Sequence, residues 1–248
     1  MINRRYSMLI SVIIPAHNEE KYIAKCLRSI RIAAREISDR VEIIVVANRC
    51  TDSTATIARR FGATVFENGD KCISSIRNAG VRASSGKVVV TIDADSVMHR
   101  TALAEIKELL RSGEYIGGGA IPVFDRMSLG IAASGAYVAL NLLPIMIKSG
   151  GALSATMFWF RRKDFDKLGG FDESLVSLED ADFAKRLKAL GKRYGKKYGT
   201  LKRGVVLTSS RKFDEFGDWY LLKNRKLTKR IFTGRDRQAA DEFYYDVR

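Results

Sequence analysis

Two carboxylates that follow an apolar run are the residues best placed to carry chemistry in this chain. Residues 88–92 read Val-Val-Val-Thr-Ile, and Asp93 and Asp95 follow with one residue between them. Such a β-branched run predicts a buried strand, and side chains two positions apart on an extended backbone point to the same side. The pair can therefore hold a divalent cation together with a ligand phosphate, as is usual for Mg²⁺. Alternatively, both carboxylates cap the next helix, which we expect to begin near His99.

Polar turns also follow the first two predicted strands. Residues 9–15 run into Asn18 and Glu19, and residues 41–46 run into a turn that contains Asn48. In open parallel sheets, ligands bind beyond the carboxyl ends of the strands, and helix N-termini there favour phosphate. Neither G-x-G-x-x-G nor a Walker lysine loop follows the first strand, so we expect neither a dinucleotide-binding site nor a P-loop.

These residues must be positioned by alternating strands and helices. The predicted strands are residues 9–15, 41–46, 64–66 and 87–92, and the predicted helices are residues 19–34, 51–61, 73–83 and 101–111. This βαβ series predicts an α/β fold with a mostly parallel sheet and helices on both faces. Arg77 lies on the helix before the Asp93 strand, which would bring its guanidinium to the same edge. The alternative for Arg77 is an ordinary surface charge.

The second half of the chain is less regular. We expect a strand over residues 115–124, an apolar helix over residues 131–147, a strand over residues 152–160, a helix that opens at Glu179, and then two short strand-like pieces before a basic amphipathic tail. Carboxylates in the first turn of the Glu179 helix suit the positive end of its dipole. The apolar helix falls short of 18 uninterrupted apolar residues, so we expect it to be buried or interfacial and not to span a membrane.

Charge is concentrated in one region. The formal net charge is +15, and residues 185–237 hold 18 Lys and Arg against 4 Asp and Glu. A basic region on a nearly neutral body suggests an anionic partner, which could be a phospholipid surface, a polyanionic acceptor or nucleic acid. The alternative is a set of solvated helix faces.

The cysteine and histidine content limits the compartment and the metal chemistry. Three cysteines without C-x-x-C spacing fit a reducing cytosol, and only two separated histidines make a zinc site unexpected. The apolar run near the N-terminus is interrupted by Pro15, His17 and Asn18, so we do not expect a signal peptide.

Six motifs, taken in order, resemble those of the family-2 glycosyltransferases, which have the nucleotide-diphospho-sugar transferase (GT-A) fold. They are residues 11–20 (SVIIPAHNEE), residues 42–46 (EIIVV) with residues 51–54 (TDST), residues 77–80 (RNAG), residues 93–95 (DAD), the segment of residues 158–173 with GGFDE at residues 169–173, and residues 179–183 (EDADF). The resemblance implies a single GT-A domain, which we expect over residues 1–210. The charge and aromatic pattern predicts a basic amphipathic extension over residues 211–248.

By this resemblance the chain is a metal-dependent, inverting glycosyltransferase that moves a sugar from a nucleotide-diphosphate sugar, expected to be a UDP-sugar, to an acceptor hydroxyl. The resemblance implies that the donor contacts Pro15, Ala16, Asn18, Glu19, Asn48, Arg77, Asp93 and Asp95. Asp95 and Asp93 would hold Mn²⁺ or Mg²⁺ at the diphosphate. Asp180 would be the general base, with Glu179 as an alternative base or as its orienter.

The chain departs from the family pattern in two places. The usual Asp-Asp-Gly-Ser turn reads Ala-Asn-Arg-Cys at residues 47–50, so the nucleobase would meet the Asn48 amide and not a carboxylate. The Gln-x-x-Arg-Trp motif of processive synthases is absent, which predicts a non-processive enzyme. A nucleotidyltransferase would have a Gly-rich turn that residues 15–20 lack. The alternative from another class is a non-catalytic module that binds polyanions or a membrane surface on a GT-A scaffold.

The aromatic residues of the basic tail suggest a surface role. Phe213, Phe216 and Tyr220 would share one face of a continuous helix, flanked by Lys and Arg. That face either packs on the sheet domain or attaches the protein to an anionic membrane, where the acceptor would be lipid-linked. We expect a cytoplasmic protein without a nucleic-acid partner, and peripheral attachment at the inner face of the cell membrane is a further hypothesis.

Overall fold

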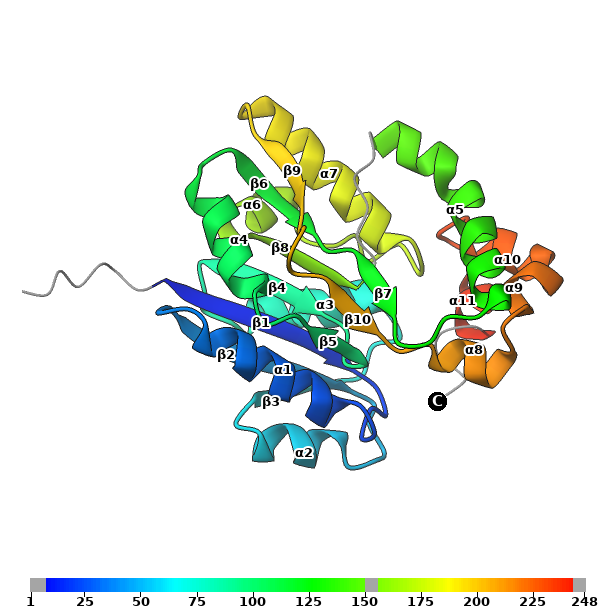
Figure 1. The fold of residues 1–248 in the computed structure, drawn as a ribbon, viewed down its shortest axis with the longest axis horizontal. Coiled ribbons are helices and arrows are strands. Elements are labelled where there is room, and N and C mark those ends of the chain that lie inside the picture. The colour runs from blue at the N-terminus through cyan, green and yellow to red at the C-terminus, as the bar shows by residue number, and fades with distance from the viewer. Residues whose placement is uncertain (1–7, 150–155, 243–248) are drawn as a thin grey trace, which may run out of the picture.

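The computed structural model describes residues 8–149 and 156–242, and these residues form a seven-stranded sheet and a three-stranded sheet (Figure 1). The large sheet has the order β3-β2-β1-β4-β8-β6-β9. Its strands are β1 (Leu9–Ala16), β2 (Arg40–Asn48), β3 (Thr64–Asn68), β4 (Val88–Ile92), β6 (Tyr115–Gly119), β8 (Met157–Arg161) and β9 (Lys197–Thr200). The first four strands in this order are parallel neighbours, whereas β8 is antiparallel to both β4 and β6. The predicted mostly parallel α/β sheet is therefore confirmed.

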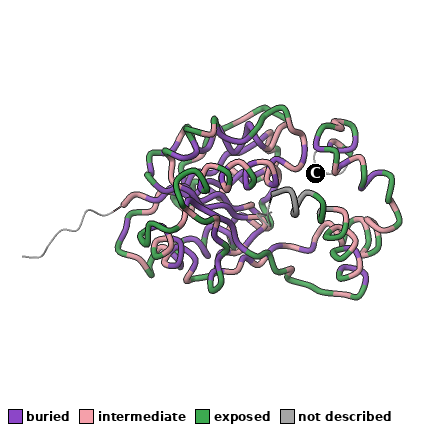
Figure 2. The backbone as a smooth tube through the Cα atoms, turned by 90° about the horizontal axis from the view of Figure 1, so that it is seen from above, coloured by how far each residue is buried: buried purple, intermediate pink, exposed green. Residues whose placement is uncertain are grey.

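Helices cover both faces of the large sheet. One face packs against α1 (Ile23–Arg35), α2 (Thr54–Arg60) and α4 (Ala102–Arg111), and the other packs against α3 (Ile73–Arg82), α6 (Arg162–Leu168) and α7 (Glu179–Arg193). Neighbouring residues of a strand point to opposite faces, so Val12 and Ile14 lie in the first core and Ile13 lies in the second. The most deeply buried residues therefore gather in the strands (Figure 2).

The small sheet corrects one prediction and excludes one alternative. Its strands, β5 (Ser96–Met98), β10 (Val206–Thr208) and β7 (Pro122–Phe124), lie in the order β5-β10-β7. The single strand predicted over residues 115–124 is wrong, because it divides into β6 in the large sheet and β7 in the small one. Asp93 and Asp95 do not cap the next helix either, since β5 separates them from α4, whose N-cap is Thr101.

The C-terminal part of the described chain is a set of short helices beside α5 (Leu129–Ser149) (Figure 1). They are α8 (Arg211–Phe216), α9 (Tyr220–Lys223), α10 (Arg225–Ile231) and α11 (Arg237–Ala240). The continuous helix predicted through Phe213 and Tyr220 is wrong, because Gly217 adopts φ +90° and ends α8. Leu227, Ile231 and neighbouring aromatic side chains nevertheless form a small apolar cluster.

The limits of other predicted elements shift by a few residues. The helix predicted from residue 19 begins at Ile23, because residues 19–22 form a turn. The strand predicted over residues 152–160 is β8, which begins at Met157, while residues 152–155 lie outside the described residues. Among the helices of the described chain, none combines the length and the hydropathy that a membrane span requires.

Candidate functional site

The predicted site residues converge on one cleft of about 490 Å³ at the carboxyl ends of β1, β2 and β4. The cleft is closed on its other sides by the start of α7 and by the C-terminal helices. Nine of the ten residues predicted to act in the site line it, namely Pro15, Ala16, Glu19, Asn48, Arg77, Asp93, Asp95, Glu179 and Asp180. Asn18 is the exception, because its Oδ1 accepts a hydrogen bond from the Thr51 N–H at 2.8 Å and so joins two turns at the rim.

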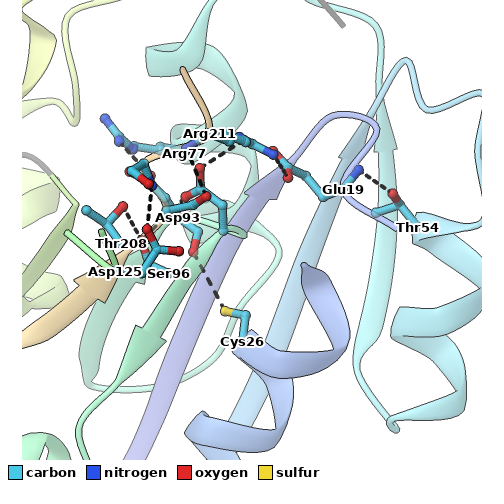
Figure 3. A network of polar contacts seen from close by, with 12 residues as sticks. Glu19, Cys26, Thr54, Arg77, Asp93, Ser96, Asp125, Thr208 and Arg211 are labelled. Atoms are coloured by element: carbon cyan, nitrogen blue, oxygen red, sulfur yellow. Dashed lines mark hydrogen bonds and ion pairs between the residues drawn. The ribbon is translucent and has the colours of Figure 1, made fainter. Parts of the chain in front are cut away.

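Arg77 connects the strand end that carries Asp93 to the first turn of α7. Its Nη1 donates to Glu179 Oε1 at 2.6 Å, and its Nη2 donates to Asp93 Oδ1 at 3.2 Å. The arginine is only 4% exposed, so it is not a surface charge. One guanidinium thus fixes the spacing between Asp93 at the sheet edge and Glu179 on α7, and Figure 3 shows Arg77 beside Asp93.

The residues that follow Arg77 explain why this helix lies so close to the site. A Cβ on Gly80 would lie 2.3 Å from Ile13 Cγ2, so only glycine allows α3 to pack this closely on β1. Asn78 donates to Phe171 O at 2.9 Å and accepts from the Phe171 N–H at 2.9 Å, which fastens the loop before α7 to α3. Residues 77–80 therefore fix the position of Arg77 and also the position of the candidate catalytic residues on α7.

An apolar wall lies behind the start of α7. Five phenylalanines pack ring against ring there, with the Phe171 and Phe183 centroids 4.2 Å apart, and the set is Phe158, Phe160, Phe165, Phe171 and Phe183. The Arg77 guanidinium carbon lies 5.5 Å from the Phe171 ring centroid. This wall excludes water from one side of the charged cluster, which strengthens its electrostatic interactions.

Two carboxyl groups of the cleft hold their protons unusually tightly. Burial, with a further contribution from the charge of Glu179, raises the pKa of Asp180 to about 7, although Arg77 opposes the change. Burial likewise raises the pKa of Asp93 to about 6 against the opposing charge of Arg77, and Asp95 adds to the rise. A carboxyl group that titrates near neutrality can accept a proton at physiological pH, which is what a general base needs.

Arg211 is the residue of the site that the sequence did not single out. Its two terminal nitrogens contact both carboxylate oxygens of Glu19, with Nη2 2.7 Å from Oε1, and Nη2 also lies 2.9 Å from Asp95 Oδ2 (Figure 3). The Tyr22 ring centroid lies 4.8 Å from the guanidinium carbon. The excess of Lys and Arg in residues 185–237 indicated an anionic partner, but nothing in the spacing of those residues marked this one.

Asn48 lines the cleft, but most of its amide is already used. Its Nδ2 lies 2.9 Å from Asn68 Oδ1 and 2.8 Å from Asp70 O, so both amide protons have acceptors within the protein. Its Oδ1 accepts from Arg49 Nε at 3.2 Å and retains capacity for a second donor. Asn48 can therefore offer a nucleobase an acceptor oxygen but no free N–H, and its role in base recognition stays a prediction.

The charges of the cleft fit a divalent cation. Its lining holds five carboxylates, Glu19, Asp93, Asp95, Glu179 and Asp180, against three cationic side chains, Arg77, Arg211 and Lys212. Burial raises the pKa of the nearby Cys26 thiol, and the charges of Asp95, Asp93 and Glu19 add to the rise. Within residues 8–149 and 156–242, no three His, Cys, Asp or Glu side chains are grouped to hold a metal by themselves. An ion here would need ligands from diphosphate and water as well.

Comparison with known sequences points to one family. Residues 11–169 match the family model described as "Glycosyl transferase family 2". Bacillus subtilis "Probable glycosyltransferase YdaM" is 28% identical over 200 residues, and the match covers 73% of this chain and 47% of that protein. Haloferax volcanii "Glycosyltransferase AglE" is 28% identical over 192 residues, covering 73% of this chain and 62% of that protein. The chain therefore spans about half to three-fifths of the length of these relatives.

Solved structures share the fold. The mannosyltransferase PcManGT from Pyrobaculum calidifontis, in complex with GDP-Man and Mn²⁺, is similar with a TM-score of 0.66 and 20% identity over 95% of this chain and 65% of that one. S. aureus TarS in complex with UDP-GlcNAc is similar with a TM-score of 0.62 and 20% identity over 82% of this chain and 59% of that one. A likeness at this level of identity establishes the fold and confirms the predicted GT-A architecture.

Proposed function

This chain belongs to glycosyl transferase family 2, and we propose that it transfers a sugar from a nucleotide-diphosphate donor to an acceptor hydroxyl. The observation that carries the proposal is the Arg77 bridge, which joins the Asp93 strand end to the carboxylates of α7 within one cleft. A donor held at the sheet edge would thereby face a base on α7. We further propose that residues 1–210 form the transferase domain and that residues 211–248 form a basic extension.

The turns after β1, β2 and β4 would hold the donor. Its nucleoside would lie across Pro15 and Ala16 toward the Asn48 oxygen, and its diphosphate would lie beside Asp93 and Asp95. The two aspartates would hold Mn²⁺ or Mg²⁺ there, and such an ion acts as a Lewis acid that stabilises the charge of the leaving diphosphate. The similar structures that contain UDP-GlcNAc or GDP-Man support this class of donor and leave its base and sugar open.

Asp180 would take the proton of the acceptor hydroxyl. Glu179 is a weaker candidate for the base because it already accepts from Arg77 at 2.6 Å, so we assign it the role of orienting Arg77 and α7. With Asp180 as a base and no nucleophile assigned, the acceptor oxygen would attack the anomeric carbon directly and invert its configuration. The absence of a processive motif in the sequence supports transfer of one sugar per encounter.

The direct test is sugar transfer itself. Purified protein should transfer or hydrolyse the sugar of a UDP-sugar or GDP-sugar with Mn²⁺ present, and a chelator should stop the reaction. A thermal-shift screen of sugar nucleotides identifies the donor, because a ligand that binds only the folded state raises stability with the logarithm of its concentration. Binding of polyanions without any effect of sugar nucleotides would favour the non-catalytic alternative.

We expect activity to rise with pH through neutrality. Because the pKa of Asp180 is raised to about 7, the base is protonated and inactive below that pH, and kcat/KM should fall about tenfold for each pH unit lost there. The folded state also binds this proton more tightly than the unfolded state, so its stabilising contribution is lost as the pH rises toward 7. Asp180→Asn should remove the part of each dependence that centres near pH 7, whereas Asp93, whose pKa is raised to about 6, should still titrate. A profile that is flat between pH 5 and 8 in the wild type would contradict the assignment.

A surface beside the cleft supports the proposal of a membrane-associated acceptor. Residues 129–147 contain no Asp, Glu, Lys or Arg, and on α5 the side chains of Leu129, Leu140 and Leu143 are 79%, 68% and 47% exposed. Exposed apolar patches mark interaction sites. The basic helices lie beside α5, with the Arg225 guanidinium 5.9 Å from the Tyr137 ring centroid. Apolar and cationic groups on one surface suit an anionic bilayer.

We expect the protein to co-sediment with vesicles that contain phosphatidylglycerol and to be released by high salt. Leu140→Asp with Leu143→Asp should lower this partitioning by roughly tenfold or more, since burying one leucine contributes about 1.5–3 kcal/mol. The matched control is Ile32→Asp on α1, a residue that is 41% exposed and lies away from this surface. Sedimentation that responds to neither lipid charge nor salt would remove the membrane from the proposal.

A further inference from the structure

The contact between Arg211 and Asp95 is built by the small sheet. Thr208 on β10 pairs in register with Ser96, the residue that follows Asp95, and the two hydroxyl oxygens lie 3.1 Å apart. The Ser210 N–H then donates to Asp125 Oδ1 at 2.9 Å, which fixes the start of α8. These two hydrogen-bonded connections thus bring Arg211 to the end of β4, although it lies more than a hundred positions after Asp95 in the sequence. The arginine side chain is only 16% exposed.

Glu19 is the anchor of this arginine. The Glu19 side chain is 3% exposed, and its backbone N–H donates to Thr54 Oγ1 at 2.7 Å, so its position is fixed by the fold. Both terminal nitrogens of Arg211 contact the two Glu19 oxygens, which is the bidentate geometry of the stronger arginine–carboxylate pairs. Asp95, by contrast, is reached through Nη2 alone. The Asp95 contact is therefore the one that can be exchanged while the arginine stays in place.

A divalent cation on Asp95 conflicts with this contact. The guanidinium lies against Oδ2, and a metal ion bound at the same oxygen would bring two positive charges together in a partly buried site. A donor diphosphate removes the conflict, because it supplies new oxygens for both cations. Nη2 can then donate to a diphosphate oxygen in place of Asp95, while Glu19 keeps both terminal nitrogens in position.

From this geometry, and on the basis of the proposed function, we infer that Arg211 is a donor-binding residue that exchanges Asp95 for the donor diphosphate. In the free protein it competes with the metal ion for Asp95. In the loaded protein it adds a second positive charge to the diphosphate. The ion and the nucleotide must then bind with positive coupling, since each makes room for the other.

The test measures two affinities that should change in opposite directions. In Arg211→Gln, Mn²⁺ alone should bind about tenfold more tightly or better, because Asp95 loses its competitor, as measured from the electron paramagnetic resonance signal of free Mn²⁺. UDP and GDP in the presence of saturating Mn²⁺ should bind about tenfold more weakly or worse by calorimetry, the size of effect typical of a hydrogen bond to a charged group. Arg211→Lys should recover part of the nucleotide affinity.

Lys226→Gln is the matched control, because it removes one positive charge from an exposed position on α10 and should alter neither affinity. Circular dichroism confirms that each variant is folded. The inference is overturned when Arg211→Gln leaves the affinity for Mn²⁺ alone unchanged or lower, or leaves nucleotide affinity unchanged. Failure of the wild type to bind either nucleotide with Mn²⁺ would instead reject the proposed function itself, so the two failures are distinguishable.

Discussion

Asp180→Asn should lower turnover by roughly 10²–10⁴, the usual contribution of a general base, while donor affinity stays near the wild-type value. The amide keeps the shape of the side chain and its acceptor oxygen for the Ala181 N–H, which lies 2.7 Å away. The amide cannot take up the proton of the acceptor hydroxyl. Since the donor would bind at the sheet edge, across the Arg77 bridge from this residue, the loss should appear in kcat and not in the dissociation constant for the nucleotide.

Two variants in the same turn of α7 distinguish loss of the base from a general disturbance of this turn. Asp182→Asn is the matched control, because Asp182 pairs with Arg186 at 2.6 Å and does not line the cleft, so turnover should change little. Glu179→Gln weakens the contact to Arg77 and should impair both turnover and donor binding, since Arg77 also holds Asp93. More than a tenth of wild-type turnover in Asp180→Asn would transfer the role of base to another group.

The sequence predicts the large sheet well because local periodicity determines its strands. Residues 88–92 are all apolar or β-branched and all buried, and the carboxylates that end this strand must then lie at a sheet edge. The motif at residues 77–80 is also informative, since Arg77 and Asn78 each make separate hydrogen bonds and Gly80 allows close packing on β1. Because strand ends and this motif both place their polar side chains at the same sheet edge, most of the predicted site residues line one cleft.

Long-range pairing was not predictable in the same way. The small sheet joins β5 to β10 and β7, and no local pattern states that residue 96 pairs with residue 208. Arg211 enters the cleft through that pairing, so the sequence predicts a basic region but does not mark Arg211 as a residue of the site. The broken tail helix has a local cause, because Gly217 adopts a left-handed conformation that the spacing of the aromatic residues did not indicate.

Asp95→Ala should weaken Mn²⁺-dependent binding of UDP or GDP by roughly 100-fold or more. Loss of a residue that only supports a metal ligand already lowers metal affinity or activity by about 10–100-fold. Asp95 is proposed to be a ligand itself, so its loss should have a larger effect. The fold should survive, because the Asp95 side chain lies at the end of a strand and Arg211 keeps its bidentate contact with Glu19. Calorimetry with Mn²⁺ and with a chelator measures the effect.

The matched control for Asp95→Ala is Asp172→Ala, an exposed carboxylate on the loop before α7 that does not line the cleft. Metal-dependent binding that is equal in both variants would remove Asp95 from the proposed metal site. Asp93→Ala should also weaken Mn²⁺-dependent nucleotide binding. It differs from Asp95→Ala because it also releases Arg77 from the sheet edge. Turnover should therefore fall in Asp93→Ala even at nucleotide concentrations that saturate the site, since the orientation of α7 depends on that bridge.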